Sequence, residues 1–131
     1  PSGALDRDQA QSRFSELIQS FDKNGFGKLA VIEKSSQKII GYCGTESCVI
    51  EDKNIRELGF RLVAEFRNKG YATEAARALL VHEKERGIIE LGAFTEPSNV
   101  QSIHVLTKLG FEKAGHSSYL GMPIVLFKLK M

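Results

Sequence analysis

The chain has 131 residues, of which 42% are hydrophobic and 26% charged, proportions typical of one soluble globular domain with a sizeable core. The formal net charge of +2 is too small to indicate a nucleic-acid-binding protein. No apolar run approaches the roughly 20 residues that cross a bilayer, and the small polar start does not resemble a signal peptide. We therefore expect a single cytoplasmic domain over residues 1–131 without membrane or direct nucleic-acid partners, and we interpret Cys43 and Cys48 as reduced thiols.

The first half of the chain predicts one helix followed by three strands. Phe14, Leu17, Ile18 and Phe21 recur at the helical period and predict a helix over Asp6–Phe21. Short apolar runs predict a hairpin of two strands, Lys28–Glu33 and Lys38–Glu46, with Cys48–Ile50 as an extension beyond a kink at Gly44. Glu51–Asn54 is a charged connection, and a third strand is expected over Glu57–Leu62.

The second half alternates helices and strands. The main helix is expected over Ala72–Arg86 and ends at Gly87, and a second begins at Pro97–Asn99, capped by Asn99 or Ser98, with an apolar face of Val100, Ile103, Leu106 and Leu109. Strands are expected over Ile88–Thr95, Phe111–Ser118 and Ile124–Leu129, with a turn at Gly121–Pro123. The order α-β-β-β-α-β-α-β-β predicts an α/β (α+β) fold, a mixed sheet with helices on its faces.

Arg67–Ala75 forms a basic turn between the third strand and the main helix. The first N–H groups of a helix have no internal partner and can hold an anion such as phosphate. Gly70 would permit unusual dihedrals, and Arg67 and Lys69 add positive charge. The alternative is an ordinary strand-to-helix turn with solvated basic residues.

Glu57 is the best candidate for a catalytic carboxylate. In the third strand it lies on the opposite face from Leu58 and Phe60, so it could act as a general base near the ligand of the basic turn. The alternative is a strand-end glutamate in solvent.

A calcium loop over Asp22–Glu33 is a weaker hypothesis. The spacing is similar to an EF-hand loop, but Phe26 replaces an oxygen ligand and a strand follows instead of a helix. The three histidines share no ligand spacing, so no metal site is expected.

Three segments together resemble the GNAT superfamily of acyl-CoA-dependent N-acetyltransferases, in particular the RimJ/RimL group, which includes enzymes that acetylate ribosomal-protein N-termini. The segments are Leu58-Gly59-Phe60-Arg61-Leu62, then Arg67-x-x-Gly70-x-Ala72-Thr73-Glu74-Ala75, then Asn99-x-x-Ser102 followed by Lys108-Leu109-Gly110-Phe111. The resemblance covers about Lys28 to Met131 and implies a mixed, mostly antiparallel sheet.

The resemblance implies acetyl-CoA as cofactor and an amine, either a protein N-terminus or a small molecule, as acceptor. The pyrophosphate of coenzyme A would lie on the backbone of Arg67, Asn68, Lys69, Gly70, Tyr71 and Ala72, the pantetheine arm would pair with Leu62, Val63 and Ala64, and Asn99 would contact the cofactor. The acceptor amine would attack the thioester directly, with Glu57 as base and a backbone N–H of the third strand stabilising the oxyanion. A monomer or homodimer is expected.

The sequence departs from the family pattern in two places. Leu106 stands where many members have a tyrosine as general acid, and Ser102, one turn earlier, is the candidate replacement. The family's usual first strand and first helix have no counterpart ahead of the helix expected at Asp6. A non-catalytic acyl-CoA-binding or regulatory module of the same fold is therefore the alternative function.

Overall fold

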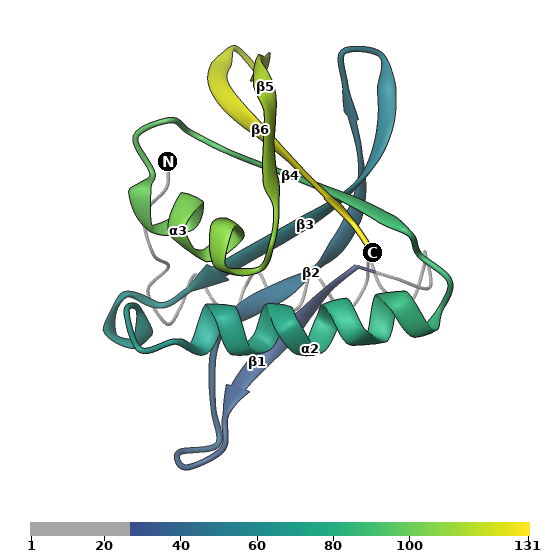
Figure 1. Cartoon of the computed structure of the whole chain (residues 1–131). Helices are drawn as coiled ribbons and strands as arrows, with labels where there is room; N and C mark the ends of the chain where they lie inside the picture. The colour runs from purple at the N-terminus through teal and green to yellow at the C-terminus, as the bar shows by residue number, and fades with distance from the viewer. Residues whose placement is uncertain (1–26) are drawn as a thin grey trace.

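The computed structural model describes residues 27–131 (Figure 1). The helix predicted over Asp6–Phe21 and the start of the Asp22–Glu33 loop lie outside the described residues. The elements, in chain order, are β1 (Lys28–Glu33), β2 (Lys38–Ile50), β3 (Lys53–Leu62), the short 3-10 helix η1 (Ala64–Phe66), α2 (Tyr71–Glu85), β4 (Glu90–Thr95), α3 (Val100–Lys108), β5 (Glu112–Tyr119) and β6 (Met122–Lys130). Apart from η1, this order agrees with the prediction for these residues.

The strands form a six-stranded sheet in the order β1-β2-β3-β4-β6-β5. Of these neighbours, β3 and β4 run parallel and the others antiparallel, which confirms the predicted mixed, mostly antiparallel sheet. Both α2 and α3 cover one face, because Ala76 of α2 and Leu106 of α3 share a buried cluster with Leu58 of β3 and Leu91 of β4 (Figure 1).

The third strand begins earlier than predicted, at Lys53 instead of Glu57. Glu51 and Asp52 have φ values of 52° and 62°, the left-handed pair that makes a tight two-residue hairpin turn. Pairing therefore starts directly beyond the turn, with Ile50 opposite Lys53. The charged residues expected to form a loop are thus a turn and the start of a strand, and β2 continues through Gly44 without a break.

Most other boundaries agree with the sequence to within a few residues. Val100 is a wrong core prediction, since it is 72% exposed at the first turn of α3. The turn near Gly121 is also shorter than predicted: Leu120 and Gly121 have positive φ values of 51° and 79°, so Pro123 already lies within β6.

A buried carboxylate fastens the C-terminal end of α2 to the sheet. The Glu83 side chain, 3% exposed, accepts hydrogen bonds from Arg56 Nε at 3.0 Å, Arg56 Nη2 at 3.1 Å and Thr45 Oγ1 at 3.0 Å. Thr45 belongs to β2 and Arg56 to β3. These contacts hold the long helix in one position, and therefore also fix where its N-terminal end lies.

Candidate active site

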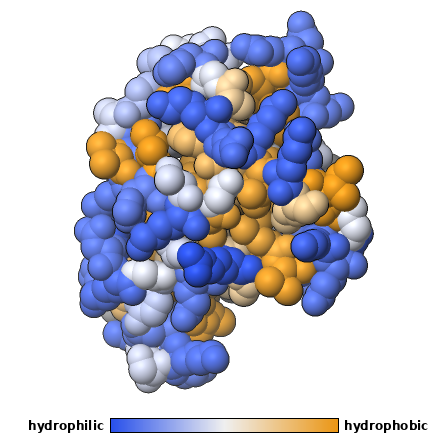
Figure 2. Space-filling view, viewed as in Figure 1, coloured by the Kyte–Doolittle hydropathy of each residue, from blue (hydrophilic) through white to orange (hydrophobic). Residues whose placement is uncertain are grey.

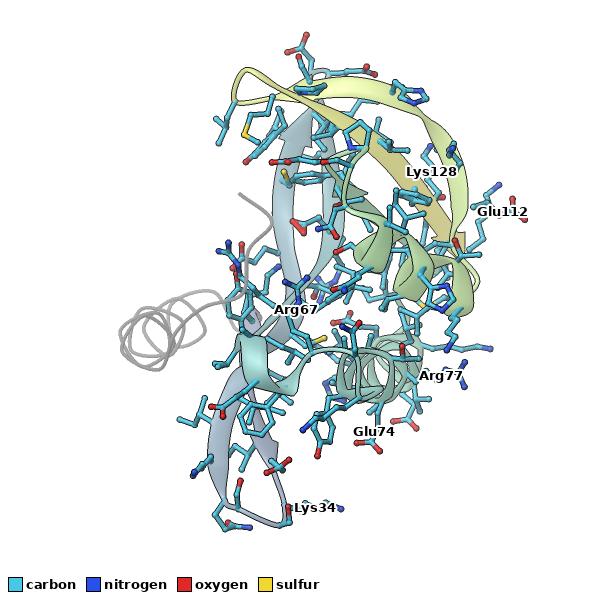
Figure 3. The ribbon with its side chains drawn as sticks, turned by 90° about the vertical axis from the view of Figure 1, so that its left-hand side faces the viewer. Lys34, Arg67, Glu74, Arg77, Glu112 and Lys128 are labelled. Atoms are coloured by element: carbon cyan, nitrogen blue, oxygen red, sulfur yellow. The ribbon has the colours of Figure 1, made fainter. Side chains whose placement is uncertain are left out.

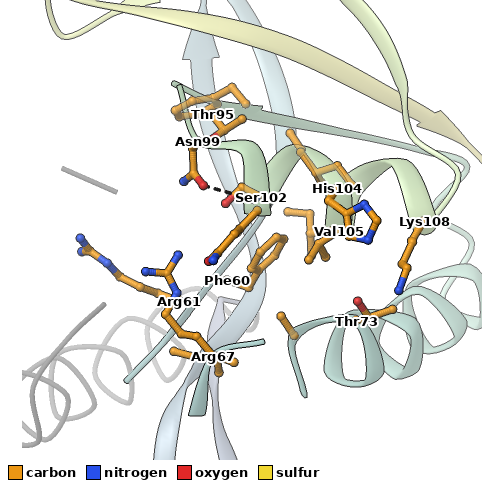
Figure 4. A pocket seen from close by; sticks show the side chains of 18 of the residues that line it. Phe60, Arg61, Arg67, Thr73, Thr95, Asn99, Ser102, His104, Val105 and Lys108 are labelled. Carbon is orange, nitrogen blue, oxygen red and sulfur yellow. Dashed lines mark hydrogen bonds between the residues drawn. The ribbon is translucent and has the colours of Figure 1, made fainter. Parts of the chain in front are cut away.

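The central feature is a cleft where β3 and β4 diverge. The parallel register between these strands consists of Glu57 opposite Gly92, and beyond it the described strands do not pair. The resulting cleft, about 810 Å³ in volume, is lined by β3, the start of α2, the end of β4 and one side of α3 (Figure 4). Figure 2, in the same view as Figure 1, shows hydrophobic residues in the middle of the molecule and toward its right-hand side, with hydrophilic residues over much of the remaining surface.

Part of the cleft wall is the backbone of β3. The N–H of Val63 donates to the carbonyl of Ile40 at 2.7 Å, so it faces β2. Because antiparallel pairing alternates along a strand, the N–H groups of Phe60 and Leu62 face the other way, toward the cleft. Val63 is buried and Ala64 begins η1, and neither lines the cleft. Of the three residues predicted to pair with pantetheine, only Leu62 lies at the cleft.

The basic turn brings the N-terminal end of α2 to the cleft. Asn68 and Gly70 both adopt left-handed conformations, with φ values of 62° and 83°, and Gly70 is the N-cap residue without a side-chain cap hydrogen bond. The N–H of Glu74 bonds to the carbonyl of Gly70 at 3.0 Å. The N–H groups of Tyr71, Ala72 and Thr73 therefore precede the first helical hydrogen bond, which is the arrangement that binds anions.

The side chains of the turn are placed differently. Arg67 lines the cleft (Figures 3 and 4). Asn68 lines it too, whereas Lys69 does not. The Nζ atom of Lys69 lies 5.7 Å from the ring centroid of Phe66. The sequence could not distinguish these cations, because their orientations depend on the left-handed conformation of Asn68 between them.

The hydroxyl of Tyr71 donates a hydrogen bond of 2.5 Å to Glu33 Oε2. This bond lowers the pKa of the Glu33 carboxyl and raises the pKa of Tyr71. It connects the end of β1 with the first residue of α2, so the helix start is held from the sheet as well as by its own backbone.

Asn99 caps α3, as predicted. Its Oδ1 atom accepts a hydrogen bond from the N–H of Ser102 at 3.1 Å (Figure 4). Asn99 and Ser102 both line the cleft, together with His104, which sequence reasoning did not select. Leu106 also lines it but is 2% exposed and packed in the core, so this position provides no proton donor.

Glu57 lies on the face of the sheet opposite the helices and is only 16% exposed, unlike a strand-end glutamate in solvent. Its Oε1 atom is 3.8 Å from Lys28 Nζ. Burial raises the pKa of Glu57, Lys28 opposes that rise, and Glu46, opposite it in the register, adds to it. All three groups line the cleft. The same-face register of β2 and β3 could have indicated Glu46, but Lys28 requires the tertiary structure.

The two cysteines are free and buried, on opposite faces of β2. Burial raises the pKa of Cys43 to about 12, so this thiol is not a nucleophile at neutral pH. Within residues 27–131, no cluster of three or more side chains suited to holding a metal ion was found. No helix in that range is both long and apolar enough to span a membrane.

Comparison with known proteins agrees with this architecture. A family model described as an acetyltransferase (GNAT) domain matches residues 1–112, and the chain therefore belongs to the GNAT acetyltransferase family. YkkB of Bacillus subtilis is 28% identical over 95% of this chain and 74% of its own length. The N-acetyltransferase p20 of Bacillus licheniformis is 32% identical over 82% of this chain, and the match spans 62% of p20.

Solved structures share the fold. The ribosomal-protein-S5-alanine acetyltransferase from Vibrio fischeri has a TM-score of 0.74 at 23% identity, covering 94% of this chain and 71% of that one. An acetyltransferase from Agrobacterium tumefaciens has a TM-score of 0.76 at 21% identity, covering 98% and 75%. The predicted membership of the family and the predicted fold class are thus confirmed.

Proposed function

We propose that the protein is an acetyl-CoA-dependent N-acetyltransferase that transfers the acetyl group to a primary amine by direct attack on the thioester. The observation that supports this function best is the cleft between β3 and β4, which opens to both faces of the sheet. A helix start whose first N–H groups have no helical partner lies on one face, and a largely buried carboxylate lies on the other.

The helix-covered face is suited to coenzyme A. The N–H groups of Tyr71, Ala72 and Thr73 bind the pyrophosphate, with Arg67 adding positive charge at the cleft wall. The N–H groups of Phe60 and Leu62 offer hydrogen bonds to the amide-containing pantetheine arm. Because Asn99 Oδ1 is used in capping α3, its amide nitrogen is the group available to the cofactor.

On the opposite face of the sheet, Glu57 acts as the general base for the acceptor amine. Its raised pKa places the carboxylate closer to the pKa of an amine than an exposed glutamate would be. As the amine nitrogen bonds to the acetyl carbon, Glu57 accepts the amine proton. The bond from carbon to sulfur then breaks, and a thiol with a pKa of about 8.5 can leave as thiolate. Ser102 is the candidate hydrogen-bond donor on α3, although an acid is not essential for such a leaving group.

The acceptor we favour is an amine of low pKa, such as a protein N-terminus. Deprotonating a lysine-like amine with a pKa of about 10.4 at pH 7 costs roughly 4–5 kcal/mol, whereas an α-amine near 7.8 costs about 1 kcal/mol. A single glutamate base can therefore deprotonate the α-amine more easily than the lysine-like amine. A ribosomal-protein-alanine acetyltransferase is among the proteins with this fold.

The second candidate is a non-catalytic acyl-CoA-binding module, which the apolar Leu106 favours. Calorimetry with coenzyme A and thiol-release assays with N-terminal peptides, polyamines and aminoglycosides separate the two functions. We expect tight binding together with turnover of at least one amine class, fastest with an α-amine. Binding without turnover of any amine would support the module, and failure to bind coenzyme A would contradict both.

A further inference from the structure

Lys28 of β1 is an almost fully buried lysine, 6% exposed. Lysine is rarely buried unless it is paired. Its Nζ atom lies 3.8 Å from Glu57 Oε1 and donates a hydrogen bond of 3.4 Å to the carbonyl of Gly44. The ammonium group therefore lies beside the carboxylate that we propose as the base, on the wall of the same cleft.

Two glycines make room for this side chain. Lys28 is opposite Gly44, and Gly44 is opposite Gly59, so the three residues form a row across β1, β2 and β3 on one face. A Cβ atom at Gly59 would lie 2.8 Å from Lys28 Nζ and 2.9 Å from Glu57 Oε1. A Cβ atom at Gly44 would lie 2.5 Å from the Cα of Lys28.

Neither glycine has a positive φ in the left-handed region. Their lack of a side chain is therefore explained by space and not by backbone conformation. The row allows the lysine to extend over the sheet from β1, cross β2 and reach Glu57 on β3.

The surroundings of Glu57 explain why a cation is needed there. Glu46 and Glu57 are cross-strand neighbours, and like charges directly opposite each other are destabilising. Burial also disfavours the charged form of Glu57. Among residues 27–131, the other titratable or charged groups that face it are Cys48 of β2, Tyr119 of β5 and Arg61 on its own strand. Across the cleft, Gly92 of β4 contributes no side chain.

We propose that Lys28 is a positioning residue for the reaction: through the space left by Gly44 and Gly59 it holds the Glu57 carboxylate ionised and directed into the cleft. This inference rests on the proposed role of Glu57 as general base. An ion pair that served stability alone would leave the pH dependence of catalysis unchanged.

The test is the pH profile of kcat/KM for the best acceptor amine. In Lys28→Met we expect the acidic limb of the profile to move upward by about 1–3 pH units, the range for loss of a neighbouring opposite charge. Lys28→Arg should restore most of the shift. Glu46→Gln should move the limb in the opposite direction, because it removes a like charge. Lys34→Met, an exposed lysine at the tip of the β1–β2 hairpin (Figure 3), is the control with the same change in net charge and should leave the limb unmoved.

Gly59→Ala is the second variant in case Lys28→Met does not fold. It displaces the lysine head group without removing a charge, and the limb should again move upward. If the limb stays in place in whichever of these two variants folds, while Glu57→Gln abolishes it, the role of Lys28 is refuted and the proposed base stands. If Glu57→Gln retains the full rate and the same limb, the base assignment fails and the role of Lys28 fails with it.

Discussion

Gly70 offers a way to separate backbone strain from ligand contact at the start of α2. Its φ of 83° lies in the left-handed region, and a Cβ atom built there meets no atom of residues 27–131 within 4 Å. Gly70→Ala therefore causes no clash with the part of the chain that the structure describes. It costs only the strain of that conformation, roughly 1–2 kcal/mol of unfolding free energy. Asparagine tolerates this conformation better than alanine does, so Gly70→Asn should lose less stability.

Binding of coenzyme A should follow the opposite order. Loss of a hydrogen bond to a charged group costs roughly 1.5–3 kcal/mol, which corresponds to about 10- to 150-fold in Kd. A side chain at residue 70 keeps the pyrophosphate from the N–H groups behind it, so Gly70→Asn should bind no better than Gly70→Ala. Lys69→Ala should weaken binding by about fivefold at most, since an exposed ion pair is worth up to about 1 kcal/mol and Lys69 does not line the cleft.

Calorimetric titration of coenzyme A, paired with urea unfolding of each variant, measures both quantities. Wild-type affinity in Gly70→Asn with weak binding in Gly70→Ala would show that strain, not contact, governs the site. A larger loss in Lys69→Ala than in Gly70→Ala would show that side-chain charge, not the helix start, binds the anion.

Three further predictions concern buried groups. Glu83→Ala should lower the unfolding free energy by about 3 kcal/mol, because it removes the buried carboxylate that accepts hydrogen bonds from Arg56 and Thr45. Urea unfolding compared with Glu85→Ala, a change at an exposed neighbour, measures this loss, and a loss equal to that of the control would contradict the prediction. The pKa of Glu57 is raised in the folded state, so the stability of the wild type relative to Glu57→Gln should fall as pH rises from about 4.3 to the folded pKa, and then stay constant. Thermal unfolding of both proteins across pH measures this difference. An increase in the relative stability of the wild type with pH would contradict the prediction. With a pKa of about 12, Cys43 should react with iodoacetamide at pH 8 on the order of 10³-fold slower than a free thiol; mass spectrometry of native and urea-unfolded protein compares the rates, and equal rates would contradict the burial.

Local patterns predicted the order of the described elements because periodicity, caps and turn residues act over a few neighbours. Asn99 is a clear case: an asparagine before an apolar helical segment predicts a cap, and its side chain accepts from Ser102. The turn at Glu51 and Asp52 was missed because two acidic residues do not indicate positive φ as glycine or asparagine does. Their conformation depends on the ten-residue pairing of β2 with β3.

The sequence alone therefore determined the α/β class and the strand–turn–helix at Arg67–Ala75, and by resemblance the family. Both kinds of signal reside in short contiguous segments. The environment of Glu57 was decided only by tertiary structure, since Lys28 and Glu46 reach it from other strands. The direction of the β3 N–H groups and the orientation of Lys69 likewise depend on pairing and packing. Charge, burial and cleft shape depend on contacts between segments that are far apart in the sequence. The sequence pattern of one strand does not tell which side chains of the neighbouring strand lie opposite it.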